Sequence, residues 1–221
     1  MAETQALLGA GTETTGNTLS VLTYHVLANP KILKTLLTEL RAAARSKQNS
    51  SFDLLNHKTL ERLPHLQACV KEALRLGTGV SSRLPRLNRL AATTYTSPSS
   101  ATNNPNSTYV FPPGISISMS ILSLHYNATI FPEPKTFNPD RWTEPSPAML
   151  SAFKPFGQGA RQCVGLELAK EELLLMAGNL FFEFGEGMEL FETTERDVSI
   201  CHDFFAPFGP ADSLGVRVLV K

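Results

Sequence analysis

A glycine-rich segment carries a cysteine to the point where a long helix is predicted to begin. It runs from Phe156 to Gly165, with the sequence FGQGARQCVG, and contains Arg161 and Cys163. The unpaired N–H groups and the positive dipole end of a helix N-terminus stabilise a thiolate. Gly159 and Gly165 would let backbone pass close to the sulfur, and Arg161 adds a nearby cation. Taken alone, the segment fits either a thiolate site or a buried structural cysteine.

A second segment conflicts with the ordinary composition of a helix. Residues 10–15 read AGTETT and lie in the middle of an otherwise helical pattern. Glycine and threonine are poor residues for a helix centre, and a local conflict of this kind often marks function. The alternative is a bent helix packed against a neighbour.

A third candidate is a pair of opposite charges. Glu72 and Arg75 lie three residues apart in a predicted helix, so they share a face and can pair. Alone, such a pair is usually solvated.

Together these segments resemble the cytochrome P-450 family. The cysteine segment fills every fixed position of F-x-x-G-x-R-x-C-x-G, the helix pair fits E-x-x-R, and residues 10–15 fit A-G-x-[DE]-T-T. The segment FNPDRW at 137–142 matches the family's third element and supplies Arg141. The resemblance implies a mainly α fold with small β-sheets. It corresponds to the carboxy-terminal half of the family fold, from the central oxygen-binding helix to the cysteine loop and final helix. Residues 1–221 are then one partial haem domain.

The resemblance also assigns roles to the cysteine segment. It implies that Cys163 is the axial ligand of the iron of haem b, that Arg161 contacts a haem propionate, and that Phe156 packs near the sulfur. A thiolate ligand makes the iron electron-rich and favours O–O cleavage. Of Arg83 and Arg86, which follow the E-x-x-R helix, we prefer Arg86 as a second propionate ligand. The remaining residues expected to contact the cofactor are Gly159, Gly165, Ala10 and Gly11.

The other two segments receive separate roles. The resemblance implies that Thr14 hydrogen-bonds the bound dioxygen and that Glu13 helps to relay protons, since an adjacent acid and alcohol suit proton delivery. Glu72, Arg75 and Arg141 are expected to form a structural network that pins the loop carrying Cys163. His125 is expected to be a structural histidine.

By family, the expected activity is that of a monooxygenase acting on a small lipophilic organic substrate, with terpenoid or other fungal secondary metabolites as the favoured class. The expected partners are dioxygen and an NADPH-cytochrome reductase. The alternatives are a truncated, non-catalytic remnant and a family isomerase or dehydratase; the intact Glu13 and Thr14 favour oxygen chemistry. A complete member is roughly twice as long as this chain. By family, it faces the cytosol on the endoplasmic reticulum, whereas this chain contains no anchor and is soluble as written.

Composition narrows the partners and the metal chemistry. The 20 Lys and Arg residues balance the 20 Asp and Glu residues, so no basic field exists to recruit nucleic acid. Cys69, Cys163 and Cys201 are far apart and form no C-x-x-C pair, which argues against a disulfide framework or a four-cysteine zinc site.

The elements that must position these residues follow from hydrophobic periodicity and from breaker residues. Helices are predicted at 2–28, 31–45, 60–76 and about 163–184, and strands at 93–96, 109–111 and 115–121. Residues 131–160 are predicted to be irregular, and paired strands are expected within 198–220. The most apolar stretch, at 173–184, is too short to span a bilayer.

Overall fold

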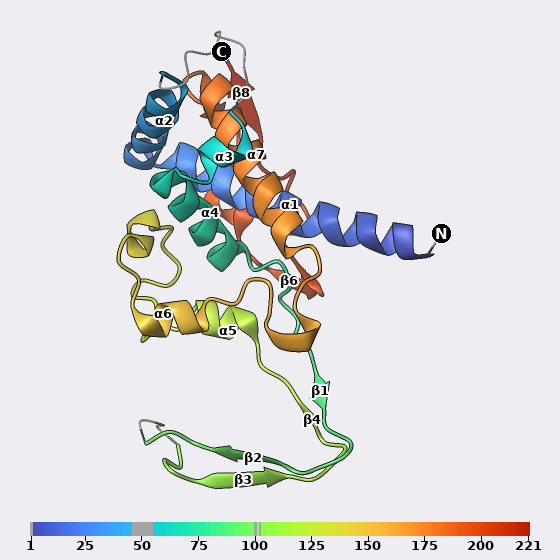
Figure 1. Ribbon diagram of the computed structural model, residues 1–221. Coiled ribbons are helices and arrows are strands. Elements are labelled where there is room, and N and C mark those ends of the chain that lie inside the picture. The colour runs from blue at the N-terminus through green and yellow to red at the C-terminus, as the bar shows by residue number, and fades with distance from the viewer. Residues whose placement is uncertain (1, 46–54, 100, 102) are drawn as a thin grey trace. The chain divides into compact units, whose positions relative to one another are not determined.

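The computed structural model describes residues 2–45, 55–99, 101 and 103–221 (Figure 1). The chain divides into two compact units. The larger unit consists of Met1–Ser82 and Ile121–Lys221, and the smaller unit is Arg83–Ser120. Most of the residues expected to do chemistry belong to the larger unit.

Helices dominate the larger unit, and short 3-10 turns connect several of them. The α-helices are α1 (Ala2–Ala28), α2 (Pro30–Arg45), α3 (His57–Leu60), α4 (Pro64–Gly77), α5 (Ile121–His125), α6 (Pro147–Ala152) and α7 (Leu166–Phe184). The 3-10 turns are η1 (Pro139–Trp142), η2 (Gly159–Arg161) and η3 (Glu195–Val198). Two small antiparallel sheets pair β5 (Met188–Leu190) with β8 (Val218–Val220) and β6 (His202–Phe204) with β7 (Ala206–Phe208).

The smaller unit consists of two antiparallel strand pairs in sequence between α4 and α5. Strand β1 (Arg86–Leu87) pairs with β4 (Ser116–Ile117), and β2 (Thr93–Thr96) pairs with β3 (Thr108–Phe111). The predicted strands at 93–96 and 109–111 are therefore confirmed.

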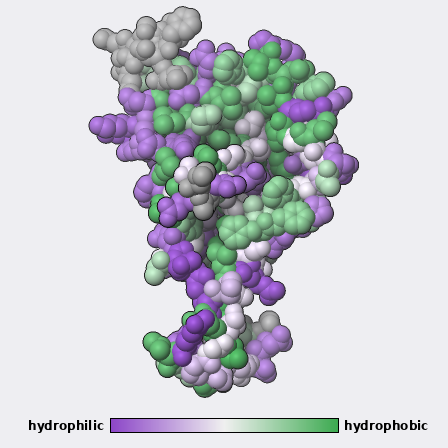
Figure 2. Space-filling view, turned by 90° about the vertical axis from the view of Figure 1, so that its right-hand side faces the viewer, coloured by the Kyte–Doolittle hydropathy of each residue, from purple (hydrophilic) through white to green (hydrophobic). Residues whose placement is uncertain are grey.

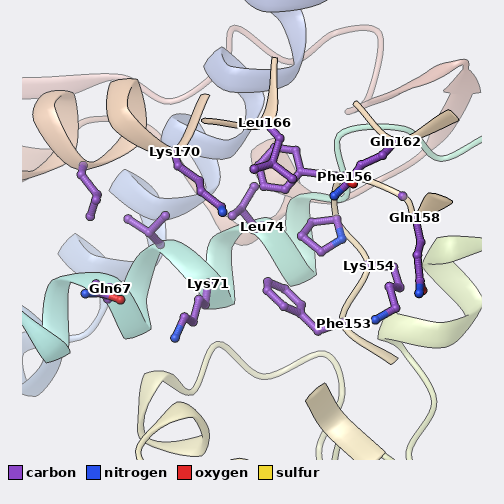
Figure 3. A pocket seen from close by; sticks show the side chains of 14 residues that line it. Gln67, Lys71, Leu74, Phe153, Lys154, Phe156, Gln158, Gln162, Leu166 and Lys170 are labelled. Atoms are coloured by element: carbon purple, nitrogen blue, oxygen red, sulfur yellow. The ribbon is translucent and has the colours of Figure 1, made fainter. Parts of the chain in front are cut away.

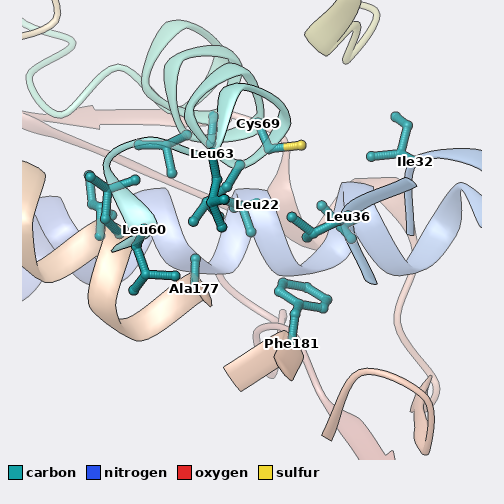
Figure 4. Close-up of a cluster of buried hydrophobic side chains, with 14 of the residues drawn as sticks. Leu22, Ile32, Leu36, Leu60, Leu63, Cys69, Ala177 and Phe181 are labelled. Atoms are coloured by element: carbon teal, nitrogen blue, oxygen red, sulfur yellow. The ribbon is translucent and has the colours of Figure 1, made fainter. Parts of the chain in front are cut away.

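The core of the larger unit lies where helices α1, α2, α4 and α7 meet. Helix α2 buries Ile32, Leu36 and Leu40, which are spaced four residues apart and so form one apolar stripe. Figure 4 shows Leu36 of this stripe near Leu22 of α1 and Phe181 of α7, which belong to the same buried cluster. Helix α4, which carries Glu72 and Arg75, contributes buried residues to the same core, and this packing holds the helix in place.

A glycine lets α3 approach α7 closely. A Cβ added at Gly178 would lie 2.5 Å from Cδ2 of Leu60, which is fully buried. Any larger residue at position 178 would force Leu60 to move, because the interior is close-packed.

Three predicted boundaries are wrong. The range 60–76 predicted as one helix is divided, since Leu60 ends α3 and α4 begins at Pro64. The break occurs because Leu63 precedes a proline and adopts an extended conformation (φ −91°, ψ 103°). Only Ser116–Ile117 of the strand predicted at 115–121 pairs with a partner, and Ile121 begins α5. Helix α7 begins at Leu166 instead of Cys163, because the cysteine still belongs to the preceding loop.

The other predicted helices agree with the structure, and the C-terminal strands agree in part. Strands β6, β7 and β8 lie within 198–220, but β8 pairs with β5, an element that the sequence did not indicate. Figure 2 shows hydrophobic and hydrophilic side chains interleaved on the face that it presents. In the described part of the chain, no helix is both long and apolar enough to cross a membrane.

Candidate functional site

The loop before α7 folds back on itself and presents the thiol of Cys163 on its surface. The backbone N–H of Cys163 donates to the carbonyl of Phe156 at 2.9 Å, which closes the loop. Gly157 and Gly159 have positive φ values of 72° and 79°, a region that favours glycine. Cys163 is a free cysteine and is exposed. The alternative of a buried structural cysteine is therefore wrong.

The sulfur lies beside the start of α7. Gly165 is the N-cap of this helix, and a Cβ added there would lie 3.9 Å from Sγ of Cys163. No side chain caps the helix, so the positive end of its dipole remains available to an anion at the sulfur. The sulfur of Cys163 therefore lies at the end of α7 where the helix dipole is positive.

The neighbours of Cys163 in the loop are accessible as well. Arg161 ends η2 and is exposed, and within the described residues its guanidinium has no recorded hydrogen bond or ion pair. Phe156 is half-buried and packs against the main core. This loop therefore combines one anchored aromatic residue with a cation and a thiol that are free to meet a ligand.

The AGTETT segment lies in a continuous stretch of α1. The hydroxyl groups of Thr12 and Thr14 donate to the carbonyls of Leu8 and Ala10, four residues earlier, at 2.8 and 2.7 Å. Glu13 is exposed, as are Ala10 and Gly11. The threonine hydroxyls therefore bond to carbonyls of the same helix, which is unbroken from Ala2 to Ala28.

Thr14 also faces the end of α4. A Cβ added at Gly79 would lie 3.5 Å from Cβ of Thr14, and the side-chain amide of Asn17 donates to the carbonyl of Gly77 at 3.0 Å. These contacts bring the AGTETT segment beside the chain that leaves the E-x-x-R helix.

Glu72 is the centre of a buried hydrogen-bond network. Its carboxylate accepts five hydrogen bonds, from Nε and Nη2 of Arg75, Nε of Arg141, Nε1 of Trp142 and the backbone N–H of Asn138. All five distances lie between 2.8 and 3.0 Å. The side chains of Glu72 and Arg75 are 0% exposed, and that of Arg141 is 6% exposed. This arrangement satisfies the requirement that a buried charge be paired and hydrogen-bonded.

The two arginines extend the network over the following segment. Arg75 Nη1 donates to the carbonyls of His125 and Pro134 at 2.8 and 2.6 Å, and Arg141 Nη1 donates to the carbonyl of Pro132 at 3.0 Å. The network thus holds residues 132–142 directly. The expectation that it pins the Cys163 loop itself needs correction, because the arginines bond to carbonyls of this other segment.

The contact between the network and the cysteine loop passes through neighbouring side chains. Nε2 of the fully buried His125 accepts the backbone N–H of Lys154 at 3.1 Å, and its Nδ1 donates to the carbonyl of Arg75 at 3.1 Å. Trp142 packs on Phe153 with ring centroids 4.6 Å apart. Burial lowers the pKa of His125 to about 4, so its ring is neutral at pH 7.

Arg86 belongs to the smaller unit. It is exposed in β1, and its Nη1 donates to the carbonyls of Leu84 and Pro85 at 3.3 and 3.0 Å.

A pocket of about 560 Å³ lies behind the cysteine loop, between α4 and α7. Its lining includes the apolar side chains of Leu74, Phe153 and Leu166 (Figure 3). Its charged lining residues are all basic: Lys71, Lys154 and Lys170. The pocket thus presents an apolar surface bordered by positive charge.

Sequence reasoning missed three contributors to this region. Trp142 and Asn138 complete the shell of Glu72, and the available signal was the position of Trp142 in FNPDRW, since Asn138 contributes only its backbone N–H. Asp203 fastens the β6–β7 hairpin, because its Oδ1 accepts the hydroxyls of Ser81 and Ser82 at 2.8 and 2.6 Å. These bonds hold the pKa of Asp203 below its usual value. No sequence motif marked that contact.

Among the described residues, no three His, Cys, Asp or Glu side chains are grouped so that they could hold a metal ion.

Comparisons with known proteins agree with the geometry. The cytochrome P-450 family model matches residues 1–190. A cytochrome P-450 monooxygenase called MO6277, from Ascocoryne sarcoides, is 40% identical over 99% of this chain. The fusicoccadiene C-8 hydroxylase of Phomopsis amygdali is 34% identical over 100% of the chain. The chain spans 40% of the length of each of these relatives.

A solved structure gives the same picture. A retinoic acid-bound cyanobacterial CYP120A1 superimposes with a TM-score of 0.75 at 26% identity, over 98% of this chain and 45% of that one. The expected fold class, mainly α with small sheets and corresponding to part of the family fold, is confirmed.

Proposed function

This chain belongs to the cytochrome P-450 family, and from that premise we propose that it is the haem-binding part of a monooxygenase. In the proposed reaction one atom of dioxygen is inserted into an organic substrate, and the sulfur of Cys163 would hold the iron of the bound haem. The exposed thiol of Cys163 beside the start of α7 is the observation that carries this proposal.

The residues around Cys163 fit a haem. The sulfur is exposed, and its neighbour Gly165 leaves open a volume that a Cβ would occupy. Nothing lies within 4 Å of the positions where Gly157 and Gly159 would carry a Cβ, so a flat macrocycle can come close to the loop. Haem, when bound, supplies an iron that a thiolate ligand makes electron-rich, which favours O–O cleavage.

The chain's cations suit the two acidic groups of haem. Arg161 has a guanidinium without a partner among the described residues, two positions from Cys163. A guanidinium binds a carboxylate with two parallel hydrogen bonds, so Arg161 is proposed to hold one propionate. Arg86 is proposed for the other, on the strength of its motif position alone.

Glu13 and Thr14 are proposed to handle protons on α1. The Glu13 carboxyl is exposed and can exchange protons with water. The Thr14 hydroxyl donates its proton to the carbonyl of Ala10, so its oxygen is free to accept a hydrogen bond. To donate to a ligand instead, Thr14 must give up that bond. If its hydroxyl proton is then transferred to the ligand, Glu13 is proposed to return a proton to the Thr14 oxygen through water.

The pocket behind the loop suits an electron-donating partner. Lys71, Lys154 and Lys170 border apolar side chains on the side of α4 and α7. An NADPH-cytochrome reductase with an acidic surface would be attracted there, and this attraction would weaken with salt.

The substrate is proposed to be a small lipophilic molecule of the terpenoid kind, because one relative is named a fusicoccadiene hydroxylase. By family, the site of action is the cytosolic face of the endoplasmic reticulum.

The deciding experiment compares two exposed cysteines, Cys163 and Cys201. The haem-loaded protein is reduced and exposed to carbon monoxide, and the far red-shifted Soret band of thiolate ligation is recorded. Cys163→His should abolish that band, and Cys201→Ser should leave it intact. A band that persists in Cys163→His, or that disappears only in Cys201→Ser, would overturn the assignment.

A further inference from the structure

A path of hydrogen bonds leads from the buried network to the cysteine loop. The carbonyl of Arg75 accepts Nδ1–H of His125, whose Nε2 accepts the N–H of Lys154. The carbonyl of Lys154 then accepts the N–H of Gly157 at 3.0 Å, and the carbonyl of Phe156 accepts the N–H of Cys163. His125 is the residue on this path whose side chain makes both hydrogen bonds, one to Arg75 and one to Lys154.

The surroundings of His125 leave its ring little freedom. The residue is 0% exposed, and the ring stacks on Phe153 with centroids 5.6 Å apart and meets Phe131 edge-on at 6.4 Å. Its own backbone carbonyl accepts Arg75 Nη1 at 2.8 Å. Both the backbone and the ring of His125 are therefore attached to Arg75, a residue that the Glu72 carboxylate holds in place.

The chemistry of the ring matches the two bonds. A carbonyl can only accept, so Nδ1 carries the proton; Nε2 must then be the acceptor for the amide of Lys154. The neutral imidazole is the state in which both bonds form, and the lowered pKa of about 4 agrees with it. An imidazolium would have no lone pair for Lys154.

We propose that His125 is a positioning residue that transmits the fixed geometry of the Glu72–Arg75 network to the loop carrying Cys163, through its hydrogen bond to the backbone of Lys154. The inference rests on the proposed function, because it assigns a purpose to the position of the loop. Its structural part, control of the loop backbone, can be measured without haem.

Substitution of His125 by glutamine or by asparagine tests the two hydrogen bonds of the ring separately. Glutamine at 125 places an oxygen near the position of Nε2 and can keep the bond to Lys154. Asparagine places a nitrogen near Nδ1 and can keep the bond to Arg75 only. Phenylalanine keeps the aromatic packing and neither bond. Tyr126→Phe is the matched control. It removes a 3.1 Å hydrogen bond from the hydroxyl of Tyr126, the residue after His125, to the carbonyl of Leu76 on α4, the helix that also carries Arg75.

The first measurement is amide hydrogen exchange of residues 153–157 in the protein without haem. Exchange at Lys154 should rise roughly tenfold in His125→Asn and His125→Phe, as expected for the loss of one buried hydrogen bond. It should remain near the wild-type rate in His125→Gln and Tyr126→Phe. Equal exchange in the Asn and Gln variants, or an increase in Tyr126→Phe as large as in His125→Phe, would overturn the proposal.

The second measurement is the fraction of the haem-loaded, reduced, carbon monoxide-bound protein that shows the thiolate band. This fraction should fall in His125→Asn and His125→Phe and be restored in His125→Gln. If the wild-type protein shows no thiolate band at all, the proposed function fails, and the exchange result still decides the role of His125. If exchange rises as expected while the thiolate fraction is unchanged, the loop moves without consequence for the ligand and the proposal fails.

Discussion

The carboxylate of Glu72 and the thiol of Cys163 belong to the same unit but differ strongly in burial and in hydrogen bonding. Glu72 is fully buried and accepts five hydrogen bonds, whereas Cys163 is exposed at the end of a glycine-rich loop. Breaking a buried ion pair leaves an uncompensated charge, while an exposed thiol has no such dependence on its neighbours. The comparison teaches that Glu72, which is expected to hold the fold, is satisfied by the chain, whereas Cys163, which is expected to bind the cofactor, is left open for a ligand.

The largest expected effect is the loss of the Glu72 charge. Glu72→Gln leaves the guanidinium groups of Arg75 and Arg141 buried without their counterion, so it should reduce the free energy of unfolding by about 3–5 kcal/mol. Denaturant unfolding followed by circular dichroism measures this change.

Glu167→Gln is the matched control for that substitution. Glu167 and Lys170 form a pair with the same three-residue spacing, at side-chain exposures of 85% and 49%. Loss of this pair should change stability by no more than about 0.5 kcal/mol. Equal effects of the two substitutions would remove the distinction between the buried network and the exposed surface.

The second prediction concerns pH. Burial lowers the pKa of both His25 and His125 from 6.5 to about 4, so each binds its proton more readily in the unfolded chain. The free energy of unfolding should therefore be at its full value above pH 6.5. It should fall as pH drops towards 4, by up to about 3 kcal/mol for each histidine. His125→Gln should flatten this dependence, and an unchanged slope would mean that His125 does not titrate as the structure indicates.

A smaller effect is expected for one donor of the network. Trp142→Phe keeps the ring packing but removes the 2.9 Å hydrogen bond from Nε1 to Glu72. Glu72 retains its other donors, so the expected loss of stability is about 1–2 kcal/mol. The melting temperatures of the Trp142→Phe and Glu72→Gln proteins give the comparison. An effect as large as that of Glu72→Gln would mean that the network depends on the indole rather than on the arginines.

The smallest effect on stability, and the sharpest on chemistry, is expected on α1. Thr12 and Thr14 make the same hydrogen bond to a carbonyl four residues earlier, and each change to alanine should alter stability by less than about 0.5 kcal/mol. Thr14→Ala should divert reducing equivalents to peroxide in the haem-loaded protein, and Thr12→Ala should not. The measurement is the NADPH consumed relative to product and peroxide formed. Equal coupling in both variants would make Thr14 an ordinary helix residue.

Short-range patterns carried most of what could be predicted. The apolar stripe of α2 and the spacing of Glu72 and Arg75 are visible within one or two helical turns. Backbone donors have no sequence signature, so the contribution of Asn138 to Glu72 could not be seen. The division of the 60–76 helix was readable, because Pro64 restricts the residue before it.

Long-range pairing explains the other errors. Strand β5 exists because Val218–Val220 returns beside it, and three residues with one buried position show no alternation of their own. Alternation over 115–121 suggested a longer strand, although only Ser116–Ile117 finds a partner. For the site, the motifs supplied the candidate residues. The motifs did not reveal the proposed role of His125 between the Glu72–Arg75 network and the Cys163 loop, because the partners of its ring are a backbone carbonyl and a backbone amide of distant residues.

Of the three cysteines, Cys69 is buried whereas Cys163 and Cys201 are exposed, so their alkylation can report on the state of the protein. Cys69 is fully buried, and burial raises the pKa of its thiol to about 12, so an alkylating reagent reaches it only after unfolding. Cys201 is exposed, so it is alkylated in folded and unfolded molecules alike, and its signal serves as the reference for the total amount of protein. Cys163 is exposed in the free chain and would be masked once its sulfur is bonded to iron. A single mass spectrum after brief alkylation would then count folded molecules at Cys69 and cofactor-loaded molecules at Cys163.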